Sequence, residues 1–167
     1  MSKKIVAVLS AVLLCLCLTF AACIYNARTP DGTNSGGEQY EENNDGEEIT
    51  EMYLYVNGEK LKVALADNSS VDALIEILKQ GDITYTAYAN DFEIYGDIGH
   101  NLGTDNNAQM TSEPGDVLLY IGSNICIFYD SNSWSYTRIG KIESYSASQL
   151  KAILAPSGSV QVTISLK

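Results

Sequence analysis

The sequence is poor in several residue types on which common active sites depend. Its 167 residues contain one histidine, His100, and this excludes a zinc site built on two or three histidines. Basic residues are also scarce, because 10 lysines and arginines stand against 21 aspartates and glutamates and leave a net charge of −11. An acidic surface repels phosphate backbones, so we expect no nucleic acid among the partners. The length predicts one globular domain with flanking segments.

The N-terminus has the pattern of a secretory signal peptide. Lys3 and Lys4 precede an almost wholly apolar run over residues 5–22, which ends on Ala21-Ala22. A single transmembrane anchor is the alternative interpretation. The apolar run is barely long enough to span a bilayer, however, and no cluster of basic residues follows it. We therefore expect residues 1–22 to direct export and to be removed.

The end of this run, Phe20-Ala21-Ala22-Cys23, resembles the lipobox of bacterial lipoproteins. The resemblance implies that the chain is cut before Cys23 and that the Cys23 thiol carries lipid, with acyl chains such as palmitate. It also implies that the lipid holds the domain on the extracytoplasmic side of the bacterial cell membrane. Two acyl chains give the stable anchoring that one chain cannot. With Cys15 and Cys17 discarded, Cys126 is the single cysteine of the folded part, and no disulfide is expected there.

An acidic segment without periodicity separates Cys23 from the expected domain. Over residues 24–51, eight acidic residues oppose Arg28, and glycine, asparagine and serine fill much of the remainder. Low hydrophobicity with charge of one sign favours a flexible, extended linker. Calcium binding is the alternative, but the carboxylates lack the fixed spacing of a calcium loop. We therefore interpret residues 23–51 as a lipidated tether.

Residues 52–167 have the pattern of one mainly β domain with two short helices. Asn57-Gly58 between two alternating runs predicts a hairpin. Helical spacing of apolar residues follows Asn68 and, later, Ser146. Strands are expected at 52–56, 60–65, 83–88, 116–121, 125–129, 134–142 and 160–166, and 91–111 is expected to be loop with short strand pieces. This set predicts a closed or nearly closed barrel whose ends the helices cover.

Several blocks of this region resemble the cyclophilin-like domains of small bacterial proteins. They occur in order and with compatible spacing, and they are Val56-Asn57-Gly58, Tyr95-Gly96-Asp97-Ile98, Pro114-Gly115-Asp116-Val117, Ile127-Phe128-Tyr129 and the segment 133–142. The resemblance covers essentially all of 52–167. It implies a closed eight-stranded β-barrel with two helices, and no settled activity accompanies it.

Prolyl isomerisation, the activity of true cyclophilins, is the alternative function. That activity needs an arginine which binds the twisting carbonyl, among apolar residues that hold the proline. In the cyclophilins this arginine follows a phenylalanine-histidine pair in an early strand. Here the only arginine of the domain is Arg138, in a late strand, and no such pair occurs. We therefore expect a binding module without enzymatic activity, and we keep weak isomerisation of exported proteins as the alternative.

Other chemistry finds little support in the sequence. No G-x-S-x-G block occurs and His100 has no matching nucleophile motif. Cys126, inside an apolar strand, is typical of a small buried hydrophobic residue. The carboxylates Asp91, Glu93, Asp97 and Asp105 offer an acid–base pair or, with Asn106 or Asn107, calcium ligands. In a segment rich in glycine and asparagine such carboxylates favour turns and solvent, so we expect no metal and no cofactor.

Trp134, Tyr136 and Arg138 occupy alternate positions of one strand and therefore share a face. Such a face provides a ligand platform through stacking and cation–π contacts. The alternative, which we favour for Trp134, is that the face points into the barrel, with Arg138 paired to a carboxylate such as Asp97. The 90–111 segment supplies the second candidate rim. The candidate ligand-binding residues are Tyr95, Asp97, His100, Asn101, Trp134, Tyr136 and Arg138, and the ligand is an unidentified small molecule, peptide or protein.

Overall fold

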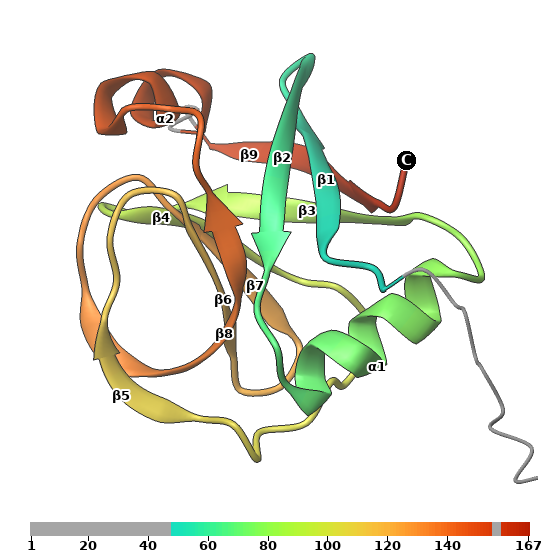
Figure 1. Ribbon diagram of the computed structural model, residues 1–167. Helices are drawn as coiled ribbons and strands as arrows, with labels where there is room; N and C mark the ends of the chain where they lie inside the picture. Colours follow the sequence, from blue (N-terminus) through green and yellow to red (C-terminus); the bar gives the residue numbers. More distant parts are fainter. Residues whose placement is uncertain (1–47, 155–157) are drawn as a thin grey trace, which may run out of the picture. The chain divides into compact units, whose positions relative to one another are not determined.

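The computed structural model describes residues 48–154 and 158–167, and within these ranges it contains nine strands and two helices (Figure 1). The elements are, in order, β1 (Glu51–Val56), β2 (Glu59–Leu65), α1 (Ser69–Leu78), β3 (Ile83–Ala89), β4 (Glu93–Asp97), β5 (Ala108–Thr111), β6 (Asp116–Tyr120), β7 (Asn124–Phe128), β8 (Ser133–Ile142), α2 (Ala147–Leu154) and β9 (Ser159–Ser165).

The first two strands form the predicted hairpin. Asn57 and Gly58 have φ angles of 51° and 83°, which is the left-handed conformation that a two-residue type I′ turn requires. Val56 therefore pairs directly with Glu59, and the antiparallel register continues to the pair of Glu51 and Ala64. β1 starts one residue before the expected position, because Glu51 already pairs in this ladder.

Eight antiparallel strands close into a barrel, as predicted. The strand order is β2-β1-β9-β3-β4-β7-β6-β8, and the ring closes through pairing of Val63–Leu65 in β2 with Gly140–Ile142 in β8. The ninth strand, β5, lies outside this ring and pairs with the first residues of β8. The segment expected as loop with strand pieces thus contains β5 and also β4, which is a full barrel strand between β3 and β7.

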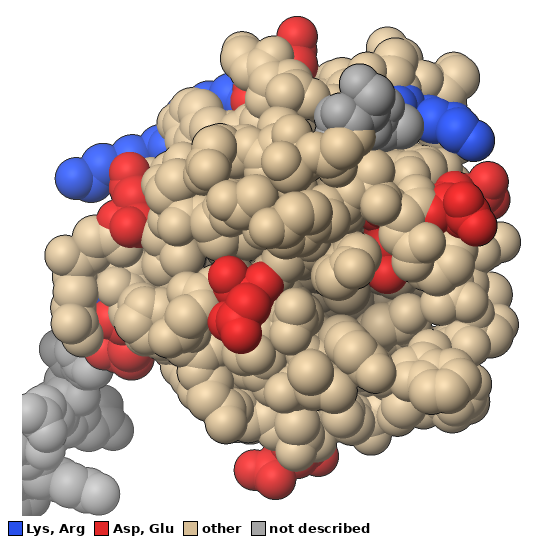
Figure 2. Space-filling model, turned by 180° about the vertical axis from the view of Figure 1, so that it is seen from behind, with Lys and Arg blue, Asp and Glu red and all other residues tan. Residues whose placement is uncertain are grey.

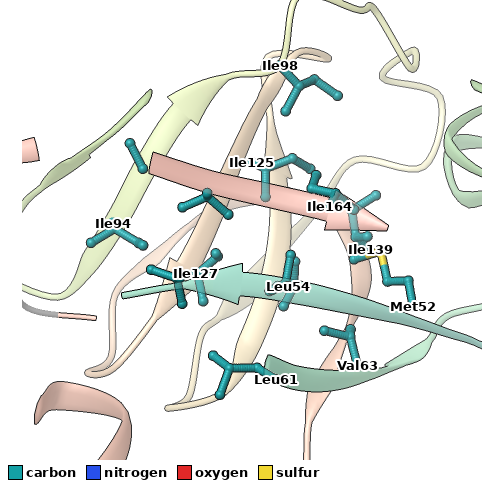
Figure 3. Close-up of a cluster of buried hydrophobic side chains, with 14 of the residues drawn as sticks. Met52, Leu54, Leu61, Val63, Ile94, Ile98, Ile125, Ile127, Ile139 and Ile164 are labelled. Carbon is teal, nitrogen blue, oxygen red and sulfur yellow. The ribbon is translucent and has the colours of Figure 1, made fainter. Parts of the chain in front are cut away.

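Alternate residues of the strands fill the barrel with aliphatic side chains. Figure 3 shows Leu54, Ile94, Ile125, Ile127 and Ile164, which come from β1, β4, β7 and β9, pointing toward one another. All five are fully buried. Their odd–even alternation along each strand leaves the intervening residues on the outer surface. This alternation decides which side chains are available for a site.

Close packing of strands at the point of closure requires glycine. A Cβ atom at Gly140 would collide with the backbone oxygen of Ala64 and lie 2.6 Å from a methyl carbon of Val63. Only glycine lets β8 approach β2 this closely.

Both helices begin at the predicted caps. The Asn68 side chain accepts hydrogen bonds from the backbone N–H groups of Ser70 and Val71 at 3.1 and 3.2 Å. Before α2, the Ser146 hydroxyl and the Gln149 side chain each bond the other residue's backbone N–H, which is a capping box. The two helices lie at opposite ends of the barrel in Figure 1.

A second apolar cluster lies outside the barrel sheet and is separate from the barrel core. Its buried members are Leu118, Cys126, Phe128 and Tyr136, with Phe92, Met110 and Tyr120 packed against them. These residues alternate with core residues along β6, β7 and β8, so they project from the outer face of the sheet. This outer cluster supports the candidate site.

Candidate functional site

A pocket of about 440 Å³ opens on the outer face of the barrel over β4, β7 and β8. This volume is in the range of small-molecule sites. Its lining consists of aromatic, amide and apolar side chains with one carboxyl group: Asn90, Glu93, Tyr95, Tyr120, Ile121, Asn124, Cys126, Asn132, Trp134 and Tyr136.

The strand register explains why these residues meet. Tyr95 of β4 is the direct cross-strand partner of Cys126 in β7, and residues two positions apart on a strand share a face. Glu93 therefore joins Tyr95 on the outer face, while Ile94 between them points into the core. The same alternation in β8 places Trp134 and Tyr136 on the pocket side.

Aromatic contacts fix the floor of the pocket and leave its rim exposed. Tyr136 is 4% exposed and packs edge-on against Phe128 and Tyr120, with ring centroids 5.5 and 6.1 Å apart. Trp134 and Tyr95, in contrast, are 56% and 38% exposed. Large exposed aromatic side chains around one hollow are typical of interaction sites.

The loop between β6 and β7 adds an unusual rim residue. Ile121 has a φ angle of 46° and exposes 61% of its surface. A β-branched residue with this backbone conformation is strained, because its side chain crowds the backbone. The turn thus holds an apolar side chain at the rim at a conformational cost.

Glu93 is the only lining residue that carries a formal charge, and its side chain is buried. The residue is 7% exposed, and its Oε2 atom has no hydrogen-bond partner. Burial raises the pKa of the Glu93 carboxyl group, and the neighbouring Cys126 thiol and Asn90 side chain only partly oppose this rise. A buried acceptor without a partner is costly for the fold and available to a ligand.

Cys126 lies beside Glu93 but is poorly suited to act as a nucleophile. The residue is 2% exposed. Burial, and then the nearby Glu93 carboxylate, strongly raise the pKa of its thiol. Because the thiolate is the reactive form, the structure supports the prediction of a small buried hydrophobic residue.

Three of the seven candidate ligand-binding residues line the pocket: Tyr95, Trp134 and Tyr136. The expectation that the Trp134 face points into the barrel is wrong. Trp134 lies on the first half of β8, opposite Met110 of β5, and this half extends beyond the part of β8 that closes the ring. The Trp134 ring therefore lies on the outer surface of the barrel and not in its core.

Asp97, His100 and Asn101 do not line the pocket. The side-chain oxygens of Asp97 and Asn101 accept hydrogen bonds from the backbone N–H groups of Gly99 and Gly103, at 2.7 and 2.8 Å. These are local turn bonds. His100 is exposed.

Arg138 is paired, although not with Asp97 as one interpretation had it. Its guanidinium lies 2.8 Å from Asp116, whose side chain is 2% exposed. Lys141 and the backbone N–H of Glu113 contact the same carboxylate, both at 2.9 Å. Burial acts to raise the pKa of Asp116, but the Glu113 N–H, Lys141 and Arg138 together outweigh it and hold the pKa below its ordinary value. Arg138 therefore serves the fold at this point and lies outside the pocket.

Sequence reasoning did not single out Tyr120, Ile121 or Asn124, and it considered Glu93 only among carboxylates for acid–base or calcium chemistry, which it expected to serve turns and solvent instead. One signal was present, since Glu93 is an acidic residue between the apolar Phe92 and Ile94 in a strand. It was not distinguishable from the neighbouring turn carboxylates without the pairing of β4 with β7.

The described part of the chain shows neither a cluster of metal ligands nor a helix that could span a membrane. Residues 48–154 and 158–167 contain no group of three or more histidine, cysteine, aspartate or glutamate side chains placed to hold a metal ion. Within those ranges, neither helix has the length and apolar composition needed to cross a bilayer. The predicted signal peptide, Cys23 and residues 24–47 of the predicted tether lie outside the described residues.

The fold and site define a small closed antiparallel barrel that carries a ligand-sized pocket on its outer face. The sequence matches the model of the cyclophilin-like family over residues 54–165, and the chain belongs to this family. A similar solved structure is the hypothetical protein AF2241 from Archaeoglobus fulgidus, with 19% identity, a TM-score of 0.54, and coverage of 73% of this chain and 99% of the archaeal one. A search of curated proteins found no match. The predicted family and barrel are thereby confirmed.

Proposed function

We propose that this protein is a membrane-tethered extracytoplasmic binding module, and that the outer pocket takes a small molecule or a side chain of a peptide or protein without chemical turnover. The observation that carries the proposal is the pocket itself. Exposed Tyr95, Ile121 and Trp134 surround a cavity whose floor is rigidly packed. Rigid support beneath exposed aromatic side chains is the usual design of a binding site.

The chemistry of the lining supports binding over catalysis. The pocket offers amide groups, one carboxyl group and a thiol with a raised pKa. Isomerases of the cyclophilin type use an arginine as the donor to the twisting carbonyl. Arg138, the only arginine of the domain, is bound to Asp116 and does not line the pocket. Weak isomerisation of exported proteins remains the alternative function.

The charge of the surface agrees with a partner other than nucleic acid. On the face shown in Figure 2, lysine and arginine occur only near the upper margin, while acidic residues are scattered over it. The chain as a whole carries a net charge of −11. Such a surface repels phosphate backbones.

The pocket provides its own reporter for a binding test. Trp134 is the only tryptophan of the chain and lies at the rim. We expect members of a library of small organic fragments and short peptides to change its fluorescence in a saturable manner. Tyr95→Ala should weaken such binding, whereas Tyr55→Ala, an equally exposed tyrosine on β1, should not. The proposal would be contradicted if no member of the library showed saturable binding that Tyr95→Ala weakens.

A proline-isomerisation assay on a test peptide separates the two functions. The binding module should leave the rate of cis–trans conversion at its uncatalysed value. An acceleration that Tyr95→Ala abolishes and Tyr55→Ala preserves would instead establish the isomerase alternative at this pocket.

A further inference from the structure

We propose that the pocket binds an organic cation that carries N–H donors, an alkylammonium or guanidinium group, with the Glu93 carboxylate as its counter-ion. The inference rests on the proposed function, because it names the ligand class of the same pocket. The group belongs either to a free amine or to the end of a basic side chain.

The first argument is the unpaired oxygen of Glu93. Glu93 is only 7% exposed and lines the cavity. Its Oε2 atom has no hydrogen-bond partner. Buried carboxylates are normally paired or fully hydrogen-bonded. A ligand with an N–H group supplies the missing donor, and a charged one also neutralises the carboxylate.

The second argument is the charge balance of the lining. Glu93 is its only residue with a formal charge, and no lysine or arginine is among the ten lining residues. An anionic ligand would face this carboxylate with no cation to offset it. The Asn124 and Asn132 side chains add amide oxygens, which accept further N–H bonds.

The third argument is the aromatic rim. Tyr95 and Trp134 expose large parts of their rings, and Tyr120 and Tyr136 lie behind them. Ring faces attract ammonium and guanidinium groups, tryptophan most strongly. The apolar stem of an alkylamine or of a lysine or arginine side chain can lie along the same rings. Carboxylate and aromatic faces in one cavity thus match both parts of such a ligand.

The N–H requirement separates this ligand from a quaternary ammonium ion. A quaternary ammonium ion satisfies the aromatic faces but donates no hydrogen bond to Oε2. Primary alkylammonium and guanidinium ions do both, so they should bind more tightly than a trimethylated analogue of the same length.

Binding of a cation should depend on pH in one direction. A bound cation favours the ionised form of Glu93, whose pKa is raised by burial in the free protein. Affinity should therefore increase as the pH rises through this titration. The other titratable groups that interact with Glu93 are Cys126 and Tyr129 at β7 and Tyr136 on β8, and burial raises all three pKa values above their ordinary basic range. With pKa values raised above these ordinary values, the three groups are neutral at and below neutral pH.

The test uses the full chain in a non-ionic detergent, with Trp134 fluorescence and calorimetry as readouts. The probes are n-butylammonium, n-butylguanidinium, butyltrimethylammonium, n-butanol and butyrate. We expect the first two to bind at least about tenfold more tightly than the others. Short peptides with one internal lysine, with and without a blocked amine, then separate a free amine from a basic side chain as the source.

The matched variants are Glu93→Gln and Asp97→Asn. Both remove one negative charge from β4, but Asp97 lies outside the pocket. Glu93→Gln should weaken n-butylammonium binding about tenfold or more and abolish its pH dependence, while Asp97→Asn should leave both unchanged. Equal binding to Glu93→Gln and to the parent, or preferred binding of butyrate or butanol, would overturn the proposal. In the latter case the pocket still binds, and the proposed function stands. If no cation binds and the fragment and peptide library finds no pocket ligand either, both fail together.

Discussion

At Glu93 the protein buries a carboxyl group that its own side chains do not fully satisfy. The strand β4 forces this position, because Ile94 and Gly96 must face the crowded core and Glu93 then faces the outer cluster. A side chain that serves only stability would be apolar here. The residue is therefore the place where the requirements of folding and of binding conflict most clearly.

Replacing Glu93 with glutamine should raise the free energy of unfolding at neutral pH by about 1 kcal/mol, because no charge is then buried. The sign of the pH dependence follows from the raised pKa of Glu93 in the folded state. The native protein holds this proton more tightly than the unfolded chain, so the parent loses stability as the pH rises above the ordinary value of 4.5. Glu93→Gln should lack this loss. Urea denaturation of both proteins between acidic and neutral pH measures the difference, and parallel pH profiles would contradict it.

Asp116 shows the opposite case, a buried carboxylate with a full set of partners. Arg138→Ala and Lys141→Ala should each cost about 1 kcal/mol, because the other cation and the Glu113 N–H remain in place. The double variant leaves the carboxylate without a cation and should cost about 3–5 kcal/mol, more than the sum. Denaturation of the three variants checks this. Additive losses would show that Asp116 does not need a cation.

The same carboxylate also makes stability depend on pH. Since the pKa of Asp116 is lowered in the folded protein, the stabilisation that the ionised group provides is lost as the pH falls below the ordinary value of 3.8.

Among the elements, β8 has two halves with different tasks. Its last residues close the barrel against β2 and pair with β6. Its first residues leave the ring, pair with β5, and carry aromatic side chains over the outer face. One strand therefore connects the closure of the fold to the candidate site.

Two aromatic residues of the first half should respond differently to truncation. Tyr136→Ala should cost about 3–5 kcal/mol, because its ring is 4% exposed and fills the outer cluster. Trp134→Ala should cost less than about 1 kcal/mol, since its ring is 56% exposed. Chemical denaturation followed by far-ultraviolet circular dichroism measures both without relying on tryptophan. Similar losses would mean that the Trp134 ring is packed in solution.

The turn between β6 and β7 carries the second element-scale prediction. Ile121→Asn should stabilise the protein by about 1 kcal/mol, because asparagine tolerates a positive φ angle and isoleucine does not. Little apolar burial is lost, since Ile121 is 61% exposed. Thermal unfolding is the measurement, with Ile125→Val in the barrel core as a destabilising control. A lower melting temperature of Ile121→Asn would show that the side chain contributes more by contact than its conformation costs.

At the scale of the whole molecule, the domain is expected to work at a membrane surface. The barrel ladder begins at Glu51, and the N–H of Leu65 donates to the Thr50 carbonyl at 2.8 Å. These are the first contacts of the barrel within the described residues. We expect the acidic segment from Cys23 to this point to behave as a coil and to span on the order of 30 Å.

Replacing Cys23 with serine should remove the lipid anchor. We expect the variant to move from the membrane to the soluble fraction, or to remain uncleaved, because serine offers no thiol for acylation. Fractionation with incorporation of labelled palmitate measures this. Ser35→Ala in the predicted tether is a control that should behave like the parent. A Cys23→Ser variant that fractionates, migrates and labels like the parent would refute the lipobox interpretation.

Local interactions made much of the fold predictable from sequence. The Asn57-Gly58 turn, the Asn68 cap and the capping box at Ser146 each depend on residues within a few positions of one another. Strand alternation gave the sets of residues that share a face, such as Trp134 with Tyr136. Segment 93–97 was harder to assign, because it contains two acidic residues and a glycine, which also suit turns.

The sequence by itself therefore determined the main turns, the caps, the two faces of the strands that it predicted, and the family. Only the tertiary structure decided which face of β8 lies outside the barrel and which distant residues meet there. Glu93 comes from β4, far from Cys126 and Tyr136 in the chain, which lie on the consecutive strands β7 and β8. Their approach depends on non-local pairing and on closure of the ring. A period of two shows that residues share a face of the sheet, but only closure makes one face the interior and the other a place for a ligand.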